Sequence, residues 1–210
     1  MIARVSAAKA AAASGFALLL AGCVSFGPEP PENLFTLTPD NRVAQGASAM
    51  AASGAGEGPI AVLTPETPAR LDVTRIPVTV TDTQIAYLQD AHWVEKPARL
   101  FRQLLGETLR SRTAGGGDTG ILVLDTDDTP VVATRFLRGT LLDMTYDAAT
   151  SSVIVRFDAL HTMDDGSVAS RRFEAREDGV LPEAAAVGPA LNRVANSVAQ
   201  DVADWVIAAG

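Results

Sequence analysis

The sequence is poor in the side chains that build metal and cofactor sites. It has one cysteine and two histidines in 210 residues. A zinc site usually draws three or four ligands from cysteine, histidine and carboxylate, and a single cysteine cannot form a disulfide framework. His92 falls in a predicted loop and is interpreted as a surface histidine, and His161 is interpreted as half-buried on a strand. We therefore expect no metal and no cofactor.

Motifs for catalysis are missing as well. No Gly-x-Ser-x-Gly turn is present to expose a nucleophilic serine. The glycines at 115–117 end a predicted helix instead of opening one, so they do not form a phosphate-binding loop. Asp125, Asp127 and Asp128 lack the glycine and the distal glutamate of a calcium-binding loop, which favours a solvated turn. The sequence predicts a protein that is not an enzyme.

Basic residues are outnumbered by acidic ones. The chain has 17 lysines and arginines against 25 aspartates and glutamates, and a formal net charge of −8. Nucleic-acid binding depends on basic side chains that neutralise phosphates, so this excess of acid argues against a nucleic-acid partner. It also argues against broad electrostatic adhesion to anionic lipid.

No apolar run is long enough to cross a bilayer. The run of apolar and small residues from Ala10 to Leu20 is shorter than the roughly 20 residues that a membrane-spanning helix needs. It follows Arg4 and Lys9, with no acidic residue before it, which is the order of an export signal. We predict that residues 1–22 are a signal peptide.

The one cysteine lies directly after this segment. Leu20-Ala21-Gly22-Cys23 resembles the lipobox of bacterial lipoproteins, in which the cysteine takes a diacylglyceryl group and becomes the new N-terminus. The alternative is an ordinary secretory signal with an incidental cysteine. We expect lipidation of Cys23, because the only cysteine of the chain lies at the lipobox position. Two or three acyl chains would hold the protein almost permanently at a membrane. Val24 in place of an aspartate favours the outer membrane over the inner one, with the domain facing the periplasm.

The mature chain divides into a tether and one domain. Residues 23–33 are rich in proline and predict an extended lipidated tether. Residues 34–210 are the predicted domain, in which residues 43–58 are mostly alanine, glycine and serine and predict a flexible loop.

Strands are predicted by alternation and by short apolar runs. They lie at residues 34–38, 60–63, 71–80, 84–88, 121–124, 136–146, 151–163 and 166–175. The last three form an antiparallel meander, because residues 147–150 and 164–166 have hairpin-turn chemistry. Pro77 lacks an N–H group, which places its strand at an edge or at a bulge.

Two helices are predicted. Pro97 opens the first, and its apolar stripe is Leu100, Phe101, Leu104, Leu105 and Leu109. Pro182 begins the second, which has an apolar stripe of Val187, Leu191, Val194, Val198, Val202 and Trp205 and a polar side that includes Asn192 and Asn196. We predict an α+β fold with an antiparallel or mixed sheet of about six or seven strands and both amphipathic helices packed on one face.

The order of several short segments resembles one known family. These segments are Leu71–Ile76, Gln84–Leu88, Ala91–Trp93, Pro97–Leu100, Asp165–Ala175 and the long C-terminal amphipathic helix. Together they are similar to the ABC-type transport auxiliary lipoproteins, which include the paraquat-inducible protein C group. The resemblance covers residues 35–206.

This resemblance implies a non-catalytic periplasmic component of an ABC-linked MCE system that moves lipids or other hydrophobic compounds across the envelope. The implied partners are the membrane, through lipid on Cys23, and an MCE-domain protein with its ABC permease complex, with a homo-oligomer as a further possibility. The alternative is a periplasmic carrier or an outer-membrane assembly lipoprotein that itself binds a hydrophobic ligand. The low aromatic content, 5%, disfavours a large apolar pocket and favours the adaptor.

Three side chains are candidates for partner docking, namely Tyr87, His92 and Trp93. They lie between a predicted strand and the helix that Pro97 opens, and aromatic residues dominate many interface hot spots. The alternative is that the tryptophan packs under the helix. We expect His92 to be exposed and to contribute to docking, with Tyr87 and Trp93 supporting its loop from below.

Overall fold

A computed structural model of the chain describes residues 33–43, 58–114, 122–124 and 132–209. All of them belong to one unit, Pro31–Gly210. Several predictions lie outside the described residues: the signal peptide, Cys23 and nearly all of the tether, most of the loop 43–58, the glycines at 115–117 and the aspartates at 125–128.

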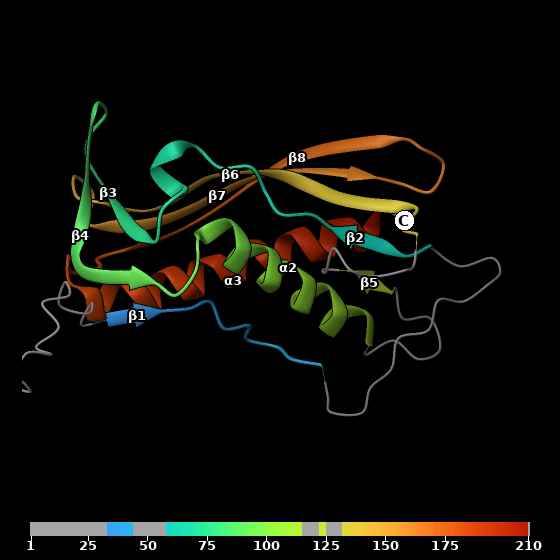
Figure 1. The fold of residues 1–210 in the computed structure, drawn as a ribbon, viewed down its shortest axis with the longest axis horizontal. Helices are drawn as coiled ribbons and strands as arrows, with labels where there is room; N and C mark the ends of the chain where they lie inside the picture. The colour runs from blue at the N-terminus through green and yellow to red at the C-terminus, as the bar shows by residue number, and fades with distance from the viewer. Residues whose placement is uncertain (1–32, 44–57, 115–121, 125–131, 210) are drawn as a thin grey trace, which may run out of the picture. The chain divides into compact units, whose positions relative to one another are not determined.

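The elements follow one another in a clear order (Figure 1). They are β1 (Asn33–Phe35), β2 (Ile60–Val62), a 3₁₀ turn (Ala69–Leu71), β3 (Arg75–Thr81), β4 (Gln84–Trp93), α2 (Pro97–Ala114), β5 (Val123–Leu124), β6 (Arg135–Asp147), β7 (Ser152–Thr162), β8 (Val168–Asp178) and α3 (Ala184–Ala208). The predicted α+β class is confirmed. Among the described residues the sheet has eight strands, where about six or seven were predicted.

The sheet is built around the antiparallel meander β6–β7–β8. On its other edge β6 has two partners, both parallel to it: β2 near its start and β3 near its end. β4 and then β1 continue the sheet beyond β3, and β5 continues it beyond β2. The order is therefore β1–β4–β3–β6–β2–β5, with β7 and β8 on the other side of β6. The sheet is therefore mixed, as predicted.

Both helices pack on one face of the sheet. Figure 1 shows α3 running along the underside of the meander with α2 beside it. The apolar stripe of α2 is buried as its spacing predicts, and the Phe101 ring meets the Phe157 ring of β7 edge to face at 5.2 Å. None of the helices in the described ranges is both long and apolar enough to cross a membrane.

No helix among the described residues covers the opposite side of the meander, and we call this side the open face. Along β7 the buried residues Val153, Val155 and Phe157 alternate with partly exposed ones such as Arg156 and Asp158. An antiparallel sheet commonly has one such face on the core and one in water. The open face therefore carries the polar side chains of each strand, and the opposite face carries the buried ones.

Two predicted boundaries are corrected. α3 begins at Ala184, with Glu183 as its N-cap, and not at Pro182. The region 71–80 starts with the 3₁₀ turn, and β3 begins only at Arg75. Pro77 is predicted to lie at an edge or at a bulge, and the bulge is what the structure has. β3 lies between β4 and β6, and its register with β4 shifts between Arg75 and Pro77.

Candidate functional site

The segment 89–93, predicted as a loop, is part of a strand. β4 continues from Gln84 to Trp93, and its last residues pair in parallel with β1, so that Leu34 lies beside His92 and Phe35 beside Trp93. Asp90 makes this possible because it adopts a left-handed backbone with φ +52°, a conformation that aspartate tolerates better than most residues. The prediction that His92 lies in a surface loop is wrong, and it is half-buried in the strand.

Trp93 points into the core. It is 1% exposed, and its ring lies edge-on to Phe35 with the ring centres 6.4 Å apart. Phe35 in turn lies against Gly188 of α3, where a Cβ atom would overlap the phenylalanine ring. The tryptophan therefore joins β1 and β4 to α3. Its indole Nε1 is buried without a hydrogen-bond partner among the described residues.

His92 and Tyr87 lie on the other side of these strands. Residues that are directly opposite in a sheet share a face, and the register pairs His92 with Arg75, Pro77 with Tyr87 and Thr79 with Ile85. We call this surface the β1–β4–β3 face, and it carries Leu34, Arg75, Ile85, Tyr87 and His92. The structure thus brings two of the three predicted docking residues onto one surface and places the third beneath it.

The β1–β4–β3 face combines apolar area with a single cationic side chain. Leu34 is 60% exposed and Ile85 is 43% exposed. The Arg75 guanidinium lies 4.4 Å from the centre of the Tyr87 ring, a cation–π arrangement. The hairpin of β3 and β4 projects away from the meander (Figure 1). Tyrosine and arginine are among the residue types that are enriched at interfaces and dominate their hot spots.

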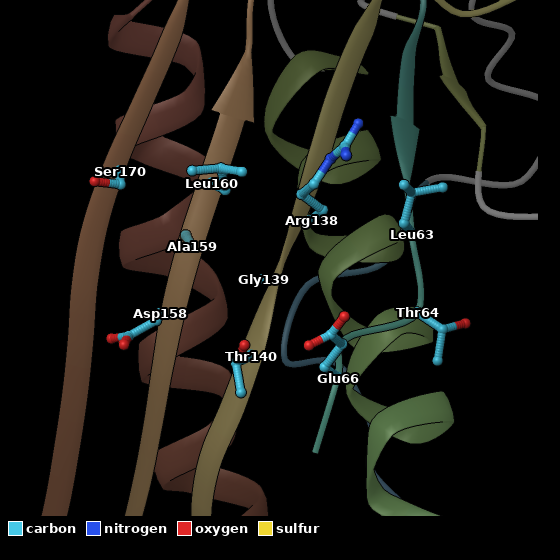
Figure 2. A pocket seen from close by; sticks show the side chains of 10 residues that line it. All are labelled: Leu63, Thr64, Glu66, Arg138, Gly139, Thr140, Asp158, Ala159, Leu160 and Ser170. Carbon is cyan, nitrogen blue, oxygen red and sulfur yellow. The ribbon is translucent and has the colours of Figure 1, made fainter. Parts of the chain in front are cut away.

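A shallow hollow on the open face is a second candidate. It has a volume of about 470 Å³ and opens widely to solvent. Figure 2 shows its lining between β8, β7, β6 and the chain that follows β2. The lining residues are Leu63, Thr64, Glu66, Arg138, Gly139, Thr140, Asp158, Ala159, Leu160 and Ser170. Its mixed charges and open form differ from the enclosed apolar pockets that hold hydrophobic ligands.

Ion pairs join the strands of the open face into rows. Asp143 of β6 accepts bonds from Arg70 at 2.7 Å and from Arg156 of β7 at 2.6 Å, and Arg156 also donates to Glu174 of β8 at 2.6 Å. The bond from Arg156 holds the pKa of Glu174 below its ordinary value. In the next row Arg172 of β8 donates two bonds to Asp158 of β7, which lower the pKa of that carboxyl.

The second histidine is buried deeper than predicted. His161 is 0% exposed, and its Nε2 lies 3.4 Å from Nη2 of Arg135, which also donates to the carbonyl of Val206 near the end of α3. The His161 ring lies 5.9 Å from that of Trp205. This arrangement ties β6 and β7 to α3. Within the described part of the chain no three or more histidine, cysteine, aspartate or glutamate side chains gather as a metal site would need.

Two asparagines play a role that sequence reasoning missed. The helical spacing predicts Asn192 and Asn196 on the polar side of α3, but Asn196 is 1% exposed. It donates to the carbonyl of Thr38 and accepts from the N–H of Asp40, both at 2.9 Å, while Asn192 accepts from the N–H of Thr38 at 2.7 Å. The two side chains hold the segment after β1 against the helix. Their i, i+4 spacing is the signal in the sequence that could have suggested a shared partner.

Comparison with known proteins identifies the family. The sequence profile of the ABC-type transport auxiliary lipoprotein component matches residues 35–203. The chain belongs to this family. The profile spans every described strand and both helices, apart from the first residues of β1 and the last turn of α3.

Two solved structures share the fold at low sequence identity, and a third is similar at a lower TM-score. Protein XCC0632 of Xanthomonas campestris, assigned to family DUF330, has a TM-score of 0.64 and 16% identity over 84% of this chain and 95% of its own. A second, uncharacterized protein has a TM-score of 0.61 and 15% identity over 84% of this chain and 97% of its own. The dodecameric PelC of Paraburkholderia phytofirmans has a TM-score of 0.40, with 16% identity over 75% of this chain and 91% of its own. No curated protein matches the sequence.

Proposed function

We propose that this auxiliary lipoprotein is a periplasmic adaptor that is held to a membrane by lipid on Cys23 and docks an MCE-type ABC transport complex for lipids or other hydrophobic compounds. The β1–β4–β3 face is the docking surface, with Tyr87 and His92 as contact residues and Trp93 as their support. Family membership supports an auxiliary role in transport. The docking proposal rests on the side chains of the β1–β4–β3 face, which combine exposed apolar area with an arginine over a tyrosine ring.

The place of this face in the chain supports its use next to a membrane complex. β1 begins at Asn33, so the tether from Cys23 joins the domain at a strand of the docking surface itself. At no more than about 3.6 Å per residue, residues 23–33 span less than about 40 Å. The docking surface would then work close to the membrane that holds the lipid, within reach of the parts of a transport complex that extend to that membrane. An outer-membrane position follows only from Val24 and is part of the proposal.

The alternative of a ligand carrier finds less support. A carrier needs an enclosed, mostly apolar site. The hollow on the open face has apolar lining at Leu63 and Leu160, but it opens widely to solvent and is bordered by the charged side chains of Glu66, Arg138 and Asp158. The core beneath the sheet is filled by the stripes of α2 and α3. The adaptor is therefore the function that the described residues favour.

Cys23→Ser tests the anchor in cells. The variant should fold like the parent but appear in the soluble periplasmic fraction and fail to incorporate labelled fatty acid, because the anchor is covalent. In cells that contain the transport complex, purification through a tag on its MCE-domain protein should recover the parent chain and lose Tyr87→Ala. Membrane association of the unlabelled Cys23→Ser chain would contradict the anchor, and full recovery of both Tyr87→Ala and His92→Ala would contradict the docking surface.

A further inference from the structure

The outer edge of β8 is a long strand edge without a partner in the described part of the chain. β8 has 11 residues and pairs with β7 along its whole length. Its other edge pairs with no strand that the structure describes. An edge of this length presents a row of backbone N–H and C=O groups to any strand that can approach it. The character of its side chains therefore decides what can bind there.

The side chains of β8 on the open face alternate in charge. In order along the strand they are Arg172, Glu174, Arg176 and Asp178. Charges on an edge strand ordinarily prevent strand addition, because an approaching edge leaves them without opposite charges. An alternating row is different, because the same row running in the opposite direction can place an opposite charge beside each of its members.

We propose that two copies of this chain associate through β8, antiparallel and edge to edge, about a two-fold axis at Ala175. In this register Arg172 lies opposite Asp178 of the second copy, and Glu174 lies opposite Arg176 of the second copy. Each of the four charges then gains an opposite charge from the other copy, in addition to the partner that it has within its own chain. Moving the axis by one residue, to Glu174 or to Arg176, would instead place like charges opposite each other.

The rows of ion pairs inside one chain support the same register. The row Asp143, Arg156, Glu174 alternates negative, positive, negative across β6, β7 and β8, and Arg176 of the second copy continues it with a positive charge. The row of Asp158 and Arg172 is continued by the negative Asp178 of the second copy. Directly opposite side chains in antiparallel strands lie about 5 Å apart at Cβ, within reach of an ion pair. The dimer therefore extends a pattern that the chain already contains.

Charge reversal gives a test that changes in folding cannot imitate. Arg176→Glu and Glu174→Arg, made separately in the full chain in mild detergent, each turn two of the cross-strand pairs into like-charge pairs. We expect the dimer dissociation constant, measured by sedimentation, to rise at least about tenfold for either variant alone. Mixing the two variants restores opposite charges at every position in the mixed pair, so a heterodimer should form with nearly the parental affinity.

Cysteine cross-linking tests the register. Ala175→Cys should give a disulfide-linked dimer under mild oxidation, because the axis places residue 175 beside its own copy. Ser170→Cys should give none, and the parent controls for Cys23. The proposal is overturned by a parent that stays monomeric at its highest soluble concentration, by variants that associate as the parent does, by a mixture that stays monomeric, or by equal cross-linking at 170 and 175. None of these results depends on the docking of a transport complex.

Discussion

Trp93 gives the sharpest test of how the candidate surface is supported. Its ring is 1% exposed and links β4, through Phe35, to α3. Replacing a fully buried tryptophan by alanine typically costs about 3 to 5 kcal/mol of unfolding free energy. We expect Trp93→Ala to lie in the upper part of this range, because the Phe35 ring would lose its edge-to-face partner, a contact worth about 0.5 to 1.5 kcal/mol beyond burial.

Trp93→Phe should behave very differently. The indole N–H is buried without a partner among the described residues, and an unsatisfied buried donor costs about 1 to 3 kcal/mol. Phenylalanine removes that cost while leaving a smaller cavity than alanine, so the two effects largely cancel and the net change should stay below about 1.5 kcal/mol. Urea unfolding followed by far-UV circular dichroism measures both variants. A Trp93→Phe loss as large as that of Trp93→Ala, or a Trp93→Ala chain as stable as the parent, would refute this account of the core.

Three further predictions follow from single contacts. Asn196→Ala should lower the free energy of unfolding, measured in urea, by about 1 to 3 kcal/mol, since two backbone groups lose their partner. Asn192→Ala should cost less because it removes one bond. Equal losses for the two variants would contradict the geometry. Gly188→Ala should destabilise despite the better helix propensity of alanine, because its Cβ overlaps the Phe35 ring, and a rise in melting temperature would refute that overlap. The pKa values of Asp158, Glu174 and Glu177 are lowered by arginine bonds. Their contribution to stability is therefore full above the unfolded values near 4 and is lost as pH falls through the lower folded values. The urea midpoint should fall as pH is lowered from about 5 to about 3, and an unchanged midpoint over that range would contradict this.

The meander and the helices could be predicted because local signals determine them. β7 alternates buried and partly exposed residues from Val153 onward, and the turns that flank it begin at Asp147 and Asp164, whose side chains are typical of turns. The start of α2 at Pro97 is likewise a local property. These elements needed no knowledge of their neighbours.

The ends of the sheet could not be predicted in the same way. Whether residues 89–93 form a loop or a strand depends on β1, a segment more than fifty positions away that supplies the pairing partner. The left-handed Asp90 allows the bend, and a single aspartate in a sequence does not reveal its backbone conformation. Asn196 was misplaced for the same reason, since its partners at 38–40 come from a distant segment. Long-range pairing therefore decided the residues of the candidate site.

Site-specific photo-cross-linking tests the central claim most directly. A photoreactive amino acid at position 87, on the β1–β4–β3 face, should form a covalent adduct in living cells with the MCE-domain protein or the permease of the transport complex. The same residue at position 201, on an exposed turn of α3, should not. Adducts at position 87 with such a component, absent at position 201, are the predicted result. Adducts with neither component at position 87, or equal adducts at both positions, would contradict the docking surface.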